Sequence, residues 1–238
     1  MNEVLQCSPA SCTREFNLGT GIFPSWNDKR GIMLCGYEWG GKDGPDGAPQ
    51  RAPLADAVFS NKVLRYGLDA LAWPFDRRIL RWFELWGHPL RRDDLGGDFE
   101  KCLIQTNWCN TQSARINGSI LEKVLDPIQI QNFLDHVRKF QPRLLLLFGA
   151  TLIKALQAPS VSAKFSDIVG AQTNGLELVQ KPFNGRRFRV GFQSFGRCDV
   201  VCLPHPSGSR NLSDAYIALF SQEISARISA VKALKGLS

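Results

Sequence analysis

The chain has 238 residues, of which 44% are hydrophobic and 21% charged, and its formal net charge is +7. No stretch approaches the roughly 18 apolar residues of a membrane span, and the N-terminus lacks the basic start and apolar run of a secretory signal. These features argue against a membrane partner and favour a cytoplasmic protein. The positive charge suits a polyanionic partner, although many proteins with such a charge have none.

No linker-like stretch divides the chain, so we expect one domain over residues 1–238, with residues 1–30 as an N-terminal arm. The chain contains seven cysteines, an odd number at spacings that fit neither a disulfide framework nor paired zinc ligands. We therefore expect reduced cysteines and no metal site. Cys35, Cys102 and Cys202 have apolar neighbours and are predicted to be small buried residues.

Short apolar runs alternate with amphipathic segments along the chain, a pattern typical of an α/β protein. We predict a three-layer fold with an open, mostly parallel, four-stranded central sheet flanked by helices. Ligands of such sheets bind beyond the C-terminal ends of the strands. The predicted strands cover residues 31–35, 101–107, 143–148 and 199–203. The predicted helices cover residues 54–72, 76–86, 127–140, 150–157 and 212–235.

A basic β-hairpin is predicted as an insert between the third and fourth of these strands. Residues 176–183 and 186–192 flank Asn184-Gly185, a pair that favours a type I′ turn. This hairpin could follow DNA phosphates, with Arg186 and Arg187 near its turn, but a solvated hairpin face explains the charges equally well. The basic residues of this region are Lys181, Arg186, Arg187, Arg189 and Arg197.

Polar loops follow the predicted strands at what should be one edge of the sheet. The first strand leads into GYEWGG (residues 36–41), the second into NWCNT (107–111), the third into GAT (149–151) and the fourth into HPSG (205–208). In this order the motifs resemble the core of the uracil-DNA glycosylase superfamily over roughly residues 31–235, and the HPSG element is the most specific. The resemblance implies a monomeric, cofactor-free enzyme that flips a base out of DNA and hydrolyses its N-glycosidic bond.

The chemistry of that reaction explains the two catalytic candidates. Breaking the bond builds positive charge on the sugar and negative charge on the departing base. The resemblance places Glu38 where the family has its water-activating Asp or Asn; the alternative is a surface glutamate. It places His205 as the neutral donor to the base carbonyl. The other histidines fit less well, since His88 lies in a predicted loop and His136 on the predicted surface of the helix at 128–140.

Several residues are candidates for holding the base. Gly36 and Tyr37 belong to the first loop, and Asn107 matches the base-reading asparagine of the family, although Asn110 is close enough to compete. Phe59 resembles in context the aromatic that stacks on the flipped base, but core packing accounts for it as well.

The loop after His205 contains the candidates for DNA contact, which include Gly208 and Ser209. Ser207 could bond a phosphate or close the turn. Arg210 is the first choice, and Leu212 the second, for the side chain that the family wedges into the duplex. For Leu212, a place in the helix core is the stronger interpretation.

The first loop departs from the family at Trp39 and Gly40, because uracil-specific members carry Pro-Tyr there and the tyrosine blocks a 5-methyl group. Its absence leaves room at C5 of a pyrimidine. Other branches with glycine here still act on uracil. The expected substrate is thus uracil or a C5-modified pyrimidine such as a (glucosyl-)hydroxymethylated cytosine, in base-excision repair or in defence against modified phage DNA.

Two other functions compete with a glycosylase. A DNA-binding protein that has lost turnover would keep the same pocket. A nucleotide-binding α/β protein is disfavoured because no glycine-rich phosphate loop follows a predicted strand. Some branches of the family hold an iron–sulfur cluster, but the placement of Cys7, Cys12 and Cys109 does not match that pattern, so we expect no cluster.

Overall fold

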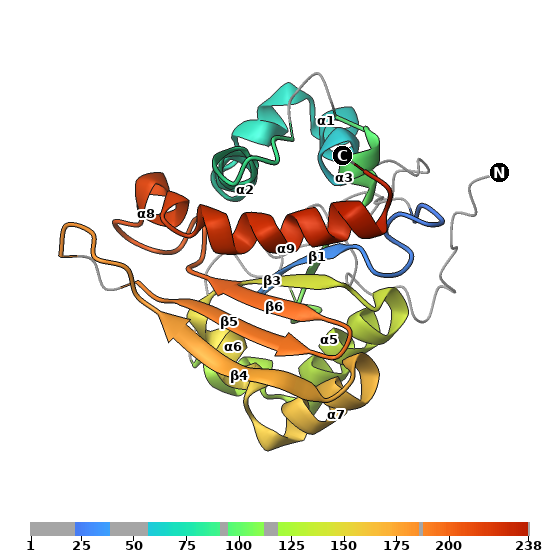
Figure 1. Cartoon of the computed structure of the whole chain (residues 1–238), viewed down its shortest axis with the longest axis vertical. Coiled ribbons are helices and arrows are strands. Elements are labelled where there is room, and N and C mark those ends of the chain that lie inside the picture. The colour runs from blue at the N-terminus through green and yellow to red at the C-terminus, as the bar shows by residue number, and fades with distance from the viewer. Residues whose placement is uncertain (1–21, 39–56, 91–94, 112–118, 186–187, 238) are drawn as a thin grey trace.

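The computed structural model describes residues 22–38, 57–90, 95–111, 119–185 and 188–237, which form a mixed six-stranded sheet between two layers of helices (Figure 1). The strand order is β2-β1-β3-β6-β5-β4, with parallel pairing from β2 to β6 and antiparallel pairing of β5 with both neighbours. The strands are β1 (Ile32–Gly36), β2 (Leu103–Asn107), β3 (Leu144–Phe148), β4 (Gln172–Val179), β5 (Val190–Phe195) and β6 (Asp199–Leu203).

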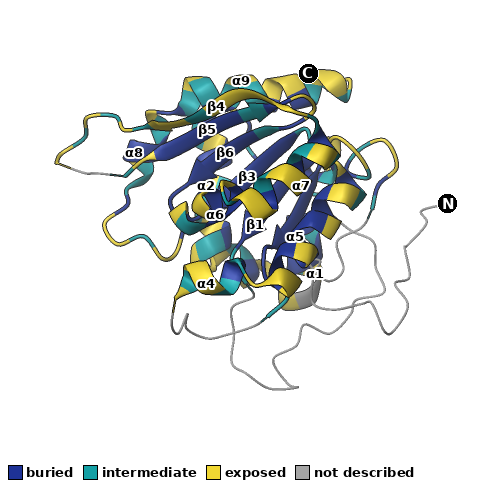
Figure 2. Ribbon diagram, turned by 90° about the horizontal axis from the view of Figure 1, so that it is seen from below, coloured by how far each residue is buried: buried dark blue, intermediate teal, exposed yellow. Residues whose placement is uncertain are grey.

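Two groups of helices cover the two faces of the sheet, as Figures 1 and 2 show. None of the helices in the described part of the chain is long and apolar enough to cross a membrane. One face carries α1 (Val58–Tyr66), the 3-10 helix η2 (Leu68–Ala72), α2 (Pro74–Leu85), α3 (Asp98–Lys101), α8 (Asp214–Ala218) and α9 (Ser221–Leu234). The other carries α4 (Ile120–Val124), α5 (Pro127–Phe140), α6 (Ala150–Leu156) and α7 (Pro159–Val169).

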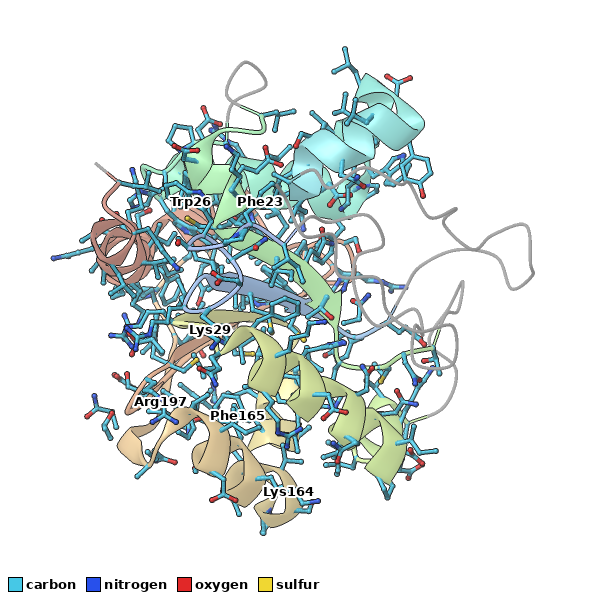
Figure 3. The ribbon with its side chains drawn as sticks, turned by 90° about the vertical axis from the view of Figure 1, so that its right-hand side faces the viewer. Phe23, Trp26, Lys29, Lys164, Phe165 and Arg197 are labelled. Atoms are coloured by element: carbon cyan, nitrogen blue, oxygen red, sulfur yellow. The ribbon has the colours of Figure 1, made fainter. Side chains whose placement is uncertain are left out.

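The central strands are apolar on both faces because helices cover both. Leu34 and Leu146 pack into the core on the α1/α2/α9 side, whereas their neighbours in the strands pack on the α5/α6/α7 side. The helices are amphipathic in turn: Phe165 of α7 points toward the sheet and Lys164 points away from it (Figure 3). Burial on both faces therefore makes the sheet a rigid platform for the loops at its ends.

The chain order creates a switch point at the C-terminal edge of the sheet. From β1 the chain crosses to β2 on one side, and from β2 it crosses back to β3 on the other side of β1. Loops at such a point diverge, and the space between them is where open α/β sheets bind ligands. The residues that follow β1, β3 and β6 meet at this point.

The α/β class is confirmed, and β1, β2, β3 and β6 match the positions of the four predicted strands. The prediction of a four-stranded, mostly parallel sheet is wrong, because β4 and β5 extend it to a mixed sheet of six strands. These strands come from the predicted hairpin and pair antiparallel, yet they span 172–179 and 190–195, so they belong to the sheet instead of forming a separate insert. The predicted helix at 212–235 is two helices, α8 and α9, and α7 was not predicted.

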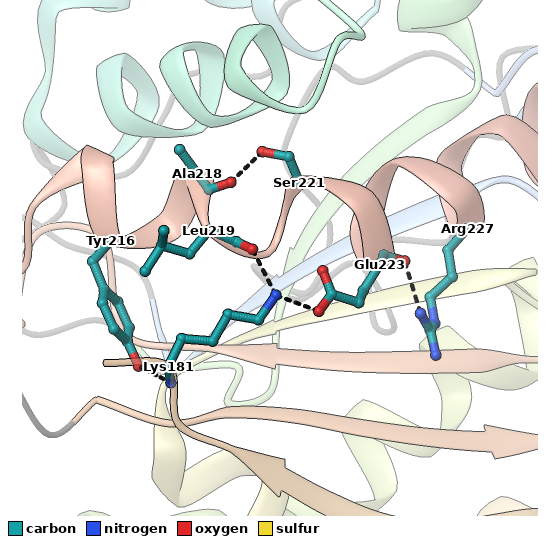
Figure 4. A network of polar contacts seen from close by, with 7 residues as sticks. All are labelled: Lys181, Tyr216, Ala218, Leu219, Ser221, Glu223 and Arg227. Carbon is teal, nitrogen blue, oxygen red and sulfur yellow. Dashed lines mark hydrogen bonds and ion pairs between the residues drawn. The ribbon is translucent and has the colours of Figure 1, made fainter. Parts of the chain in front are cut away.

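Three basic residues of the predicted hairpin region, Lys181, Arg189 and Arg197, are described by the structure, and they do not form one surface. Lys181 is ion-paired with Glu223 and donates to the carbonyl of Leu219 at 2.6 Å, which ties the segment after β4 to α9 (Figure 4). Arg197 lies in the turn between β5 and β6, at the other end of β5, and donates to the carbonyl of Ile168. Arg189 is exposed and directly precedes β5. Because β5 is antiparallel to both neighbours, it begins at the edge of the sheet where β4 and β6 end. Arg189 therefore lies on the side of the His205 loop.

Candidate active site

Gly36 and Asn107 end two adjacent strands and lie directly opposite each other in the parallel register. A Cβ added at Gly36 would lie 2.6 Å from Asn107 Oδ1, so only glycine leaves room for the amide at this position. The Asn107 residue is 8% exposed. The Asn107 amide, which carries both a donor and an acceptor, therefore lies at the C-terminal edge of the sheet between the first two loops.

Tyr37 connects the loops that follow four strands. Its carbonyl accepts from the backbone N–H of Cys109 at 2.8 Å, and its hydroxyl accepts from the backbone N–H of Thr151 at 3.2 Å. Its ring stacks on His205 with centroids 5.7 Å apart, and burial raises the pKa of its hydroxyl. Gly149 makes this possible, because a Cβ there would lie 2.2 Å from the Tyr37 hydroxyl.

Glu38 is a nearly buried carboxylate, with 6% of its side chain exposed. It is ion-paired with Lys123 of α4 and accepts a hydrogen bond from the Thr111 hydroxyl at 2.8 Å. The alternative of a free surface glutamate is therefore wrong. Lys123 was not identified from the sequence, because nothing in the local pattern of α4 distinguishes it from a solvent-facing helix lysine.

The imidazole of His205 is held in one tautomer. Its Nδ1 accepts from the backbone N–H of Gly208 at 2.9 Å, and a backbone N–H can only donate. The ring proton therefore lies on Nε2. Burial lowers the pKa of His205 to about 4, so the ring is neutral at pH 7 and presents Nε2–H as a donor.

Phe75, the second residue of α2, is the aromatic that lies beside His205. Its ring centroid is 5.7 Å from the imidazole and 5.4 Å from Phe148 of β3. Phe59, the aromatic chosen from the sequence, is fully buried in the core instead, and its backbone N–H donates to Glu100 at 2.6 Å. Core packing is thus the interpretation that the structure supports for Phe59. The sequence Trp73-Pro74-Phe75 at a helix start was the signal that could have identified Phe75.

Arg78 of α2 anchors the loop that follows His205. Its guanidinium donates to the carbonyls of Pro206 and, at 2.8 Å, Leu212. The loop also turns on itself, since the backbone N–H of Ser209 donates to the carbonyl of His205 at 3.1 Å. Leu212 is 3% exposed, which confirms its place in the core and leaves no apolar wedge there.

The DNA-binding candidates of this loop lie at the surface. Arg210, Ser207 and Gly208 are exposed, and Ser209 is partly buried. The Ser207 hydroxyl is 3.3 Å from His205 Nδ1, so it also helps to close the turn. Arg210 thus remains the candidate for the side chain that wedges into the duplex, in the same loop as His205.

Three polar side chains of α5 contact β2 and the loop that follows it. Asn132 donates to the Trp108 carbonyl at 2.8 Å, Gln129 accepts from the Asn110 backbone at 2.8 Å, and His136 Nδ1 is 2.7 Å from the Thr106 hydroxyl. The prediction that His136 lies on the surface is wrong: the residue is 1% exposed, and burial lowers its pKa to about 3. The spacing 129, 132, 136 on one helical face was the overlooked signal.

Four predicted site residues, Trp39, Gly40, Arg186 and Arg187, lie outside the described residues, as do Cys7 and Cys12. Among the residues that are described, no group of three His, Cys, Asp or Glu side chains is arranged to hold a metal ion. The predicted burial of Cys35, Cys102 and Cys202 is confirmed.

Comparison with known proteins adds no identity to this geometry. No family model matches the chain, and no curated protein matches it. The switch point of the sheet brings together a neutral imidazole, a buried carboxylate, an amide and two aromatic rings.

Proposed function

We propose that the protein is a DNA glycosylase that flips a pyrimidine out of DNA and hydrolyses its N-glycosidic bond without a cofactor, leaving an abasic site. The observation that carries this proposal is the neutral His205, whose proton lies on Nε2 because Gly208 donates to Nδ1. A neutral donor suits a reaction in which negative charge develops on the departing base. Hydrogen bonds to a developing anion strengthen in the transition state.

The role of His205 is to donate a hydrogen bond to the base carbonyl and to keep its own proton. With a pKa of about 4, the imidazole is uncharged at neutral pH. Its Nε2–H therefore stabilises the developing negative charge on the base without bringing a positive charge into the site. The two rings beside it, Tyr37 and Phe75, exclude water from the imidazole and make this hydrogen bond stronger than it would be in bulk solvent.

Glu38 supplies the negative charge on the sugar side. As the C1′ atom becomes cationic, a carboxylate nearby lowers its energy and can accept a proton from the attacking water. Lys123 and Thr111 hold the carboxylate in place in the free protein. Both contacts are to Oε2, so movement of Lys123 toward a DNA phosphate would remove the ion pair from that oxygen and leave the Thr111 hydrogen bond in place.

Asn107 and Phe75 are proposed to select and hold the base. The Asn107 amide offers a donor and an acceptor to one base edge, and the Phe75 ring offers a face for stacking. The substrate is uracil or a C5-modified pyrimidine such as a (glucosyl-)hydroxymethylated cytosine, in repair or in defence against modified phage DNA. This range rests on the sequence at Trp39 and Gly40. DNA would approach from the side of the exposed Arg210 and Arg189.

Alkali-revealed strand cleavage tests the proposal on oligonucleotides that contain uracil, thymine mismatches, hydroxymethylcytosine or glucosylated hydroxymethylcytosine. Cleavage at one base type, lost in both Glu38→Gln and His205→Ala, is the expected result. A control variant, His88→Gln, changes a histidine remote from the site and should cleave like the wild type. Cleavage that survives both site substitutions would refute the assigned roles.

A second candidate function is a DNA-binding protein with little turnover. The observation in its favour is that both Lys123 and Thr111 engage the Glu38 carboxylate, which leaves it less free to orient water. Such a protein would bind one type of modified DNA in a filter or fluorescence assay and release no base from it.

A further inference from the structure

Lys62 is a buried lysine beneath the candidate active site, with 10% of its side chain exposed. Its ammonium is ion-paired with Asp76, whose side chain is 5% exposed, and it donates to Gln105 Oε1 at 2.8 Å. These three side chains, here called the buried clamp, come from α1, α2 and β2. One ammonium group therefore joins three elements, with partners 14 and 43 positions away in the sequence.

Each end of the buried clamp is attached to a residue of the candidate site. Gln105 precedes Asn107 by two residues in β2, so both side chains leave the same face of the sheet. Asp76 directly follows Phe75, whose ring lies beside His205. The clamp thus connects the strand that carries the amide to the helix that carries the aromatic ring.

Glu100 holds the N-terminal end of α1, the helix that carries Lys62 near its middle. Glu100 accepts from the backbone N–H groups of Phe59 and Ser60 at 2.6 and 2.9 Å, which satisfies two free donors at the start of the helix. The Lys62 ammonium also lies 5.5 Å from the Phe59 ring centroid. The start of the helix that carries the lysine is therefore fixed, and the position of the Lys62 ammonium fixes the positions of the Asp76 and Gln105 side chains.

Stability alone does not explain such a cluster. The free-energy cost of removing two charges from water offsets much of the attraction between them. Apolar side chains of similar volume hold elements together equally well or better. An ion pair with a further hydrogen bond adds direction, because it fixes the distances and angles among its members. We infer that the buried clamp is a positioning network that sets the spacing between Asn107 and Phe75, and hence the width of the base-binding site. This inference rests on the proposed function.

The test compares Lys62→Met with the double variant Lys62→Met/Asp76→Leu. The single substitution leaves Asp76 buried without its partner and should lower the Tm, whereas the double substitution should return the Tm close to that of the wild type. Ile228→Ala in α9, which removes a fully buried side chain of the same core, is the control for lost stability. Three quantities are measured: DNA affinity, the single-turnover excision rate at saturating DNA, and the NMR signals of the Asn107 side-chain amide and the Phe75 ring.

The double variant should bind DNA like the wild type but excise the base about tenfold to a hundredfold more slowly, with shifted Asn107 and Phe75 signals. The Ile228→Ala control should lose stability and keep its rate. Recovery of the rate together with the Tm would overturn the inference. If the wild type excises no base, the proposed function fails, and the NMR signals alone decide the role of the clamp: unchanged Asn107 and Phe75 signals in the stable double variant would overturn it.

Discussion

The loops after β1 and β6 hold their functional groups in opposite ways. The loop after β1 presents Glu38, a charged group that an ammonium and a hydroxyl hold in place. The loop after β6 presents His205, a group kept neutral by burial and held by one backbone N–H and two aromatic rings. A carboxylate loses its charge when it is buried without a partner, and an imidazole gains none when it is buried without one.

In the proposed reaction, this difference would separate two electrostatic roles at one edge of the sheet. A permanent negative charge would stabilise the cationic sugar, and an uncharged donor would stabilise the departing base. Tyr37 joins the two halves, because it precedes Glu38 in the chain and stacks on His205. Substitutions that affect one half, the other, or the tyrosine between them should therefore have distinct results.

The largest effect is expected from Gly149→Ala, which disturbs the connection itself. The added Cβ would lie 2.2 Å from the Tyr37 hydroxyl, at a backbone φ of 134°. The clash and the strain should lower the free energy of unfolding by about 2–4 kcal/mol, as measured by urea denaturation. Gly87→Ala is the matched control, since its φ is 79° and no atom lies within 4 Å of the added Cβ; it should cost about 1 kcal/mol. Equal losses in both variants would contradict the account.

Lys123→Met should affect the loop that presents Glu38 and leave the loop that presents His205 unchanged. The carboxylate would remain buried without its ammonium partner, at an expected cost of about 1–3 kcal/mol in the free energy of unfolding. Lys123→Arg keeps the charge and should recover most of that loss. The imidazole NMR signals of His205 should stay at their wild-type positions in both variants; a shift there would show that the two halves are not separable.

Arg78→Met should loosen the His205 half by removing two hydrogen bonds to the carbonyls of Pro206 and Leu212. We expect a loss of about 1–2 kcal/mol in the free energy of unfolding, together with weaker protection of the Gly208 amide from hydrogen exchange. Arg77→Met changes the exposed arginine next to it in α2 and serves as the control. Unchanged Gly208 exchange in Arg78→Met would contradict an anchoring role.

The response of His205 to pH tests the neutral group without a substitution in the loop. Its pKa of about 4 lies below the ordinary value of 6.5, so between these values the unfolded chain binds more protons than the folded one. The free energy of unfolding should therefore fall as the pH drops from about 6.5 to about 4. His136, with a pKa of about 3, adds to this fall, and His205→Gln should remove only part of it. An NMR titration of His205 with a midpoint near 6.5 would contradict a buried neutral imidazole.

The strands and the loops at their ends could be predicted from the sequence, because both depend on local patterns. Runs such as residues 143–148 are apolar enough to need cover on both faces, and a polar loop directly after such a run is placed at the edge of the sheet. The positions of Glu38, Asn107 and His205 at strand ends follow from this logic. The predicted sheet had two strands too few because the strands of the hairpin were assigned to a separate insert. β4 is mostly exposed, so its residues do not show the apolar pattern of a strand covered on both faces.

The partners of the site residues could not be predicted, because they depend on how distant elements pack. Lys123 lies 85 positions after Glu38, and Arg78 lies 128 positions before Pro206. Neither spacing has a local signature. The same holds for Phe59 and Phe75, which are both aromatic residues near a helix start. Only the packing of distant elements leaves Phe75 partly buried beside His205 and Phe148 while Phe59 is fully buried in the core.

The most direct measurement is mass-spectrometric detection of the free base released from an oligonucleotide by the wild type, Glu38→Gln and His205→Ala. We expect the wild type to release one pyrimidine, and both variants to bind the DNA with similar affinity but release the base at least about a hundredfold more slowly. Tight binding of modified DNA by the wild type with no free base would contradict a glycosylase and favour the DNA-binding alternative.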